Sequence, residues 1–124
     1  MIKSIDHFVI TVADLEATLT FYETVLGFSR SVAPGRPAAL KFGAQKINVH
    51  QAEQTFDPKA KRPTSGAADF CLVADLPLAE VKEHIEKNGV AIELGPVRRA
   101  SARGEMTSLY FRDPDGNLIE VSEY

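Results

Sequence analysis

The chain has 124 residues, 44% hydrophobic and 25% charged, a composition typical of one globular domain or two fused half-domains. Its formal net charge of −3 provides no dominant basic face, which argues against nucleic acid as a partner. The sequence shows no bilayer-length apolar run, no signal-peptide pattern and only one cysteine, Cys71, so we expect a cytoplasmic protein without internal disulfides.

The first half of the chain shows one strand, one helix and three further strands. A β-branched strand begins at His7 and runs into Asp14, a suitable helix N-cap. Apolar residues recur at helical spacing over Leu15–Leu26, and Gly27 is a common stop signal. The strands predicted after this helix are separated by turn residues and lie at 28–32, 38–42 and 46–51.

The second half repeats this order. A strand at 69–73 runs into Asp75, again a suitable N-cap, and Pro77 would occupy the first turn of the following helix. Apolar residues recur at helical spacing until Gly89. The strands predicted after this helix lie at 90–94, 107–112 and 117–123, and the turn 113–116 makes a hairpin of the last two.

Both halves contain a strand that runs into Ala-Asp-Leu, so the chain reads as an internal repeat. We therefore predict an α+β fold in which two paired βαβββ modules, about 4–52 and 67–124, form a curved mixed sheet within a single domain, 1–124. Two polar loops interrupt the pattern. Residues 52–66 would connect the modules, and the arginine-bearing loop at 95–105 is either a solvated surface loop or a lid.

Alternation along the strands predicts which residues face away from the helices. If the apolar residues pack under the helices, four candidate metal ligands lie on the opposite faces: His7, His50, Asp69 and Glu120. Asn48 and Cys71 share these faces. A curved sheet would gather the faces into one concave pocket, and two imidazoles with two carboxylates suit Ni, Zn, Mn, Fe or Co, and Mg less well. Taken singly, each residue could equally be structural or solvated.

Three segments carry a family resemblance: 5–15, 21–28 and 110–121, the last pairing the hairpin turn with the strand that bears Glu120. They resemble the vicinal-oxygen-chelate superfamily, which includes glyoxalase I, fosfomycin-resistance enzymes, bleomycin-binding proteins and extradiol dioxygenases. More closely, the chain looks like the glyoxalase-domain-containing, lactoylglutathione lyase-like group, whose members carry a phrase similar to residues 42–50.

The resemblance implies two βαβββ modules that form a cup around a divalent metal. In glyoxalase I the ligands come from the first, fourth, fifth and eighth strands, positions that correspond here to His7, His50, Asp69 and Glu120. Glyoxalase I has a carboxylate on the fourth strand and a histidine on the fifth, so the two appear exchanged. Fosfomycin-resistance enzymes and dioxygenases also have histidine where this chain has Asp69.

The resemblance favours isomerase or lyase chemistry of the glyoxalase kind. The metal would bind two neighbouring substrate oxygens and stabilise a developing enediolate or alkoxide as a Lewis acid. Glu120 or Asp69 would transfer the proton. The arginines would hold an anionic substrate. The substrate-binding candidates are Arg98, Arg99, Arg103, Asn48 and Tyr110.

The sequence is also compatible with other functions. The chain could be a metal-free drug-binding protein of the bleomycin-resistance type, an extradiol dioxygenase, a fosfomycin-resistance-like transferase, or a structural or regulatory subunit. We expect a homodimer, because each half leaves a sheet edge unpaired and family members often pair halves between subunits. The expected partner is a small molecule rather than nucleic acid or a membrane.

Overall fold

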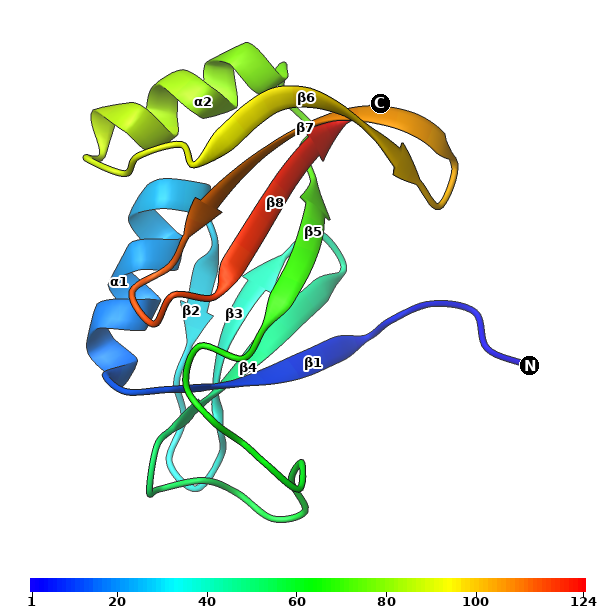
Figure 1. The fold of residues 1–124 in the computed structure, drawn as a ribbon. Coiled ribbons are helices and arrows are strands. Elements are labelled where there is room, and N and C mark those ends of the chain that lie inside the picture. Colours follow the sequence, from blue (N-terminus) through cyan, green and yellow to red (C-terminus); the bar gives the residue numbers. More distant parts are fainter. The chain divides into compact units, whose positions relative to one another are not determined.

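The computed structural model describes residues 1–124, which form two compact units, Met1–Ala67 (unit 1) and Ala68–Tyr124 (unit 2). Figure 1 shows the same order of elements in each. The elements of unit 1 are β1 (His7–Val12), α1 (Leu15–Leu26), β2 (Ser29–Ser31), β3 (Ala38–Phe42) and β4 (Gln45–Gln51). Those of unit 2 are β5 (Asp69–Val73), α2 (Leu78–Lys87), β6 (Leu94–Ser101), β7 (Gly104–Arg112) and β8 (Leu118–Glu123). The predicted α+β fold of two βαβββ modules is confirmed.

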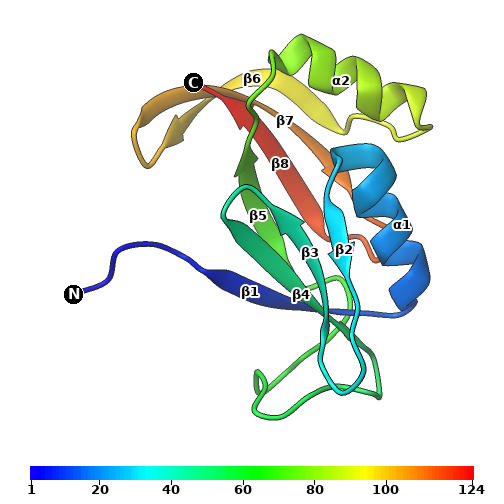
Figure 2. The same cartoon turned by 180° about the vertical axis from the view of Figure 1, so that it is seen from behind.

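Each unit contains one four-stranded mixed sheet (Figure 2). The strand order is β1-β4-β3-β2 in unit 1 and β5-β8-β7-β6 in unit 2. In both, the first strand pairs in parallel with the last, and the remaining pairs are antiparallel. The equivalent topology is the structural form of the sequence repeat. Neither helix reaches the length and hydrophobicity required to span a bilayer.

Helix α1 forms as the local sequence predicts. Asp14 caps its N-terminus, because the carboxylate Oδ1 accepts the Ala17 N–H at 3.1 Å. Gly27 ends the helix with a φ of 71°, a left-handed conformation that glycine adopts without strain. Leu19 and Tyr22 bury one helix face against β2, β3 and β4. This apolar layer fixes which face of the unit 1 sheet remains for polar residues.

Helix α2 begins differently from the prediction. Asp75 is not its N-cap; Pro77 occupies that position and provides no side-chain cap. The helix therefore starts too late for the Asp75 carboxylate to accept hydrogen bonds from the backbone amides of the second and third helical residues. Glu123 on β8 replaces it, with its Oε2 accepting the Leu78 N–H at 2.8 Å. The helix ends at Lys87, followed by Asn88 as C-cap and by Gly89 with a φ of 79°.

The predicted strand at 90–94 and the predicted loop at 95–105 are wrong. Residues 90–93 are not in a strand, whereas 94–101 form β6, which pairs with β7 in a long hairpin (Figure 1). β6 is an edge strand with a bulge between Leu94 and Val97, and its polar, arginine-rich sequence lacks the usual strand signature. Pairing with β7, rather than local preference, defines it.

Candidate functional site

In unit 1, β1 and β4 present polar residues on the sheet face opposite the apolar layer. The parallel register places His7 beside Lys46 and Thr11 beside His50, so both histidines share this face. Four residues nevertheless separate their positions along the strands. At about 3.3 Å per residue, this corresponds to roughly 13 Å. Within unit 1, the two imidazoles are therefore too far apart to coordinate one ion.

His7 is an exposed histidine with one ring nitrogen beside a carboxylate. Its Nδ1 lies 2.7 Å from the Asp6 carboxylate Oδ1, and the side chain is 43% exposed. A carboxylate acceptor holds the proton on Nδ1 and leaves the Nε2 lone pair free to coordinate a cation. The Asp6 carboxylate therefore orients the His7 ring and favours the tautomer that leaves Nε2 unprotonated. Nothing in the sequence pattern alone had assigned this role to Asp6.

His50 and Asn48 lie on the same face of β4, and each has a buried polar side-chain atom, whereas the His7 side chain is exposed. His50 is only 4% exposed, and its Nδ1 has no hydrogen-bond partner. The Asn48 Oδ1 is also buried without a partner. The Phe56 ring lies beside the imidazole, 5.5 Å between centroids. Burial, reinforced by the positive charge of Lys59, lowers the pKa of His50, so the ring is neutral at physiological pH.

The lowered pKa of His50 predicts a pH-dependent loss of stability. Because the unfolded chain binds this proton more readily, the contribution is present above the ordinary pKa of about 6.5 and is lost as pH falls below it. Between pH 7.5 and 5.5, metal-free wild type should lose more unfolding free energy than His50→Phe, by less than about 1.4 kcal/mol per pH unit. Urea denaturation measures both, and equal losses would contradict a lowered pKa.

In unit 2, Glu120 occupies the centre of the open sheet face. Its neighbour on β5 is Cys71, and its neighbour on β7 is Tyr110. Asp69 shares the face but pairs with Leu118, two residues before Glu120. The exposed Asp69 therefore lies next to Glu120 diagonally, while a thiol and a phenol flank the Glu120 carboxylate directly.

A network of hydrogen-bonding side chains on the same sheet face holds the Glu120 carboxylate. The Ser122 Oγ donates to Glu120 Oε2 at 3.3 Å, and the buried Ser108 Oγ lies 2.7 Å from Ser122 Oγ. The Cys71 Sγ lies 3.2 Å from the same Ser122 oxygen. Burial raises the pKa of the Cys71 thiol, and the negative charge of Glu120 adds to the effect. Cys71 thus stays protonated at neutral pH beside the carboxylate.

Sequence reasoning placed Cys71 and Ser122 on this face but gave them no role, and it did not single out Ser108. Serine occurs on many strands, so neither position stands out in one sequence. Only the register that brings Ser108 and Ser122 opposite each other reveals the network.

The three candidate arginines lie in the β6–β7 hairpin and not in a lid loop. Arg99 contacts Tyr110, the β7 neighbour of Glu120. The Arg99 Nε donates to the Tyr110 hydroxyl at 2.9 Å, and the guanidinium lies 5.5 Å from the ring centroid. Arg98 pairs with Glu105, and Arg103 stacks on the Tyr124 ring at 3.9 Å. Arg99 and Tyr110 are thus the substrate-binding candidates that unit 2 brings together.

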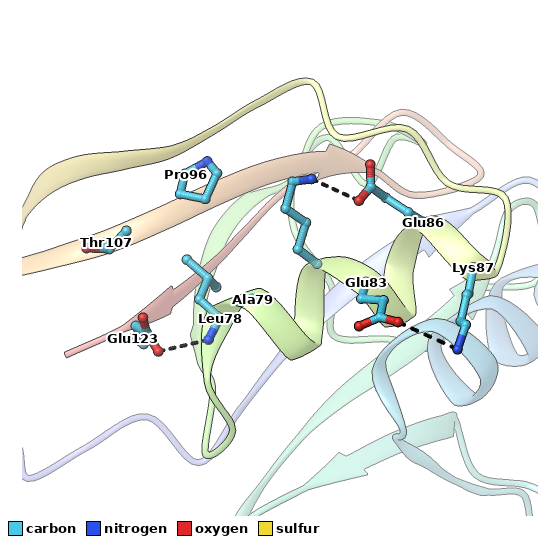
Figure 3. A pocket seen from close by; sticks show the side chains of 9 residues that line it. Leu78, Ala79, Glu83, Glu86, Lys87, Pro96, Thr107 and Glu123 are labelled. Carbon is cyan, nitrogen blue, oxygen red and sulfur yellow. Dashed lines mark hydrogen bonds and ion pairs between the residues drawn. The ribbon is translucent and has the colours of Figure 1, made fainter.

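Neither unit gathers three or more His, Cys, Asp or Glu side chains into a metal-binding group. A groove does lie along α2 (Figure 3). Its lining residues are Leu78, Ala79, Lys82, Glu83, Glu86, Lys87, Pro96, Thr107 and Glu123. Lys82 pairs with Glu86 at 2.9 Å, Lys87 pairs with Glu83 at 3.7 Å, and Glu123 accepts the Leu78 N–H. The groove contains none of the predicted site residues. The groove is therefore separate from the candidate site.

Comparison with known proteins places this architecture in a family. The chain is 52% identical over 124 residues to Virulence protein STM3117 of Salmonella typhimurium, covering 100% of this chain and 86% of the relative. The crystal structure of STM3117 superposes with a TM-score of 0.97, covering 100% and 98% of the two chains. Glyoxalase domain-containing protein RDO1 of Mycosarcoma maydis is 44% identical, with 99% and 69% covered.

A lactoylglutathione lyase structure from Agrobacterium tumefaciens has a TM-score of 0.74 and 26% identity, covering 97% of this chain and 92% of the other. Residues 4–121 match the sequence profile of the Glyoxalase/Bleomycin resistance protein/Dioxygenase superfamily. Because this match spans nearly all of both βαβββ units, the chain belongs to that superfamily.

Proposed function

We propose that the chain is a divalent-metal-dependent enzyme with isomerase or lyase chemistry of the glyoxalase kind, acting on a small molecule. His7 and Glu120 are the central proposed ligands, and the family resemblance also implies Asp69 and His50. Because His7 and His50 of one chain are too far apart to share an ion, His50 would join this set only from the second chain of a dimer. The Asp6–His7 pair carries the proposal, because it prepares an exposed imidazole for coordination. The lactoylglutathione lyase of the same fold supports the reaction class.

The donor set fits such an ion, since imidazole with carboxylate suits first-row divalent metals. When bound, the cation would supply Lewis-acid stabilisation of negative charge developing on a substrate oxygen. Glu120 accepts and returns the proton, with Ser122 fixing one carboxylate oxygen. Arg99 and Tyr110 offer hydrogen-bond donors on the same face as Glu120 and would orient the substrate.

We also propose that the working state is a cytoplasmic homodimer. In each sheet the two outer strands have a partner on one side only, β1 and β2 in unit 1 and β5 and β6 in unit 2. Such edges are natural pairing surfaces for a second copy. Metal ligands then come from one chain or from two, and mixing His7→Ala with Glu120→Ala chains would separate these arrangements, because only shared sites regain metal binding in the mixture.

Metal content tests the enzyme proposal. Protein purified without chelator should retain close to one equivalent of a divalent metal per chain. After chelator treatment, adding Ni²⁺, Mn²⁺ or Zn²⁺ at about 100 times the dissociation constant should stabilise the fold by about 2.7 kcal/mol. Elemental analysis and thermal unfolding measure the two effects. Metal-free protein that gains no stability from any of these ions would contradict metal dependence.

A metal-free small-molecule binder is the second candidate. Two observations favour it: neither unit groups three metal donors, and two buried polar atoms on β4 have no protein partner. A binder has no use for the oriented His7, so the same metal measurement discriminates between the two functions.

A further inference from the structure

The β4 strand carries two buried hydrogen-bonding atoms that the fold leaves unsatisfied. The Asn48 Oδ1 and the His50 Nδ1 belong to residues two apart, so both side chains extend from the same sheet face. Buried polar atoms in folded proteins are almost always paired, because an unpaired one loses its hydration without compensation. Two on one face are therefore expected to meet a ligand.

The surroundings of this pair are mostly apolar and short. Val9 and Ala39 flank Asn48 on the neighbouring strands, and Thr11 flanks His50. The Phe56 ring, from the segment that follows β4, lies beside the imidazole and is 37% exposed. A small polar group bound at the two atoms would have its carbon frame against apolar side chains and an aromatic ring.

We propose that Asn48 and His50 form a subsite for a hydroxyl group of an alcohol or phenol ligand. This inference goes beyond metal dependence and does not require it, since a binder and an enzyme could both use the subsite. Asn48 Oδ1 only accepts hydrogen bonds, and a neutral imidazole nitrogen either accepts or donates. A hydroxyl accepts the hydrogen bond of a protonated Nδ1 and donates its one proton to the Asn48 Oδ1, so it satisfies both atoms when His50 is in the Nδ1–H tautomer. A carboxylate or phosphate would be repelled by the amide oxygen.

The probe is phenol, compared with benzene, on chelator-treated protein, so that metal coordination plays no part. NMR titration follows the backbone and side-chain signals of Asn48 and His50. We expect saturable shifts with phenol and at least tenfold weaker binding of benzene, which has the ring but lacks the hydroxyl. Equal affinities, or phenol shifts confined to residues outside unit 1, would overturn the subsite.

Two shape-conserving variants separate ligand binding from structure. Asn48→Leu and His50→Phe should each weaken phenol binding at least tenfold, yet their urea midpoints at pH 7.5 should equal or exceed that of wild type. A residue with a structural hydrogen bond would show the opposite pattern, lower stability with binding retained, and that result would contradict the inference. His84→Phe, on α2, is the matched control and should bind phenol as wild type does. Loss of metal uptake would leave all these expectations unchanged.

Discussion

His7→Ala and Glu120→Ala should each weaken binding of Ni²⁺, Mn²⁺ and Zn²⁺ at least ~100-fold, about 2.7 kcal/mol, while the fold stays intact. Each removes one proposed inner ligand. His7 lies at the exposed start of β1, and the Glu120 carboxylate points away from the apolar layer, so neither change opens a cavity in the core. Isothermal titration gives the affinity, and circular dichroism checks the fold.

Asp6 should affect metal affinity through its contact with His7. Asp6→Asn retains the size of the side chain but removes the carboxylate that holds the His7 tautomer, so metal affinity should fall about 10–100-fold. His84→Ala and Glu83→Ala, on the exposed side of α2, are the matched controls and should bind like wild type. Unchanged metal affinity in His7→Ala or Glu120→Ala would remove the ligand assignment, whichever way the Asp6 variant behaves.

Local signals predicted the first unit well and the second less well. Asp14 and Gly27 define α1 because capping and left-handed termination depend on residues within the helix itself. β6 depends on pairing with β7 instead. Its Gly95-Pro96 dipeptide and two arginines look like loop chemistry, and no local preference shows that a hairpin partner follows. The Asp75 cap was wrong for a similar reason, since its replacement, Glu123, is distant in sequence.

For the candidate site, alternation alone identified the correct sheet faces but could not measure separations along them. His7 and His50 do share a face, yet their distance follows from the parallel register of β1 and β4, which one sequence does not reveal. The serine network beneath Glu120 required the β7–β8 register in the same way. Predicted ligands are therefore best treated as residues on a face until the pairing of the strands is known.

Gly95→Ala should be among the most destabilising single substitutions in unit 2, costing about 3 kcal/mol or more. An added Cβ would lie 2.5 Å from the Ser108 backbone oxygen and 2.8 Å from the Leu109 Cα. Because both obstacles are backbone atoms of the adjacent strand, no side-chain rotation relieves the clash. The φ of +109° adds strain for any residue with a Cβ. Urea denaturation measures the loss.

Gly104→Ala isolates the contribution of backbone conformation. Gly104 has a φ of +116°, similar to that of Gly95, but nothing lies within 4 Å of an added Cβ. Gly104→Ala should therefore lower the unfolding free energy only by the strain of an unfavourable φ, about 1–3 kcal/mol. This loss should be smaller than that of Gly95→Ala in the same experiment. Equal losses would mean that β6 can move away from β7 without penalty. The Arg99–Tyr110 hydrogen bond joins these two strands, so such movement would also change the position of Arg99 relative to Tyr110 and Glu120.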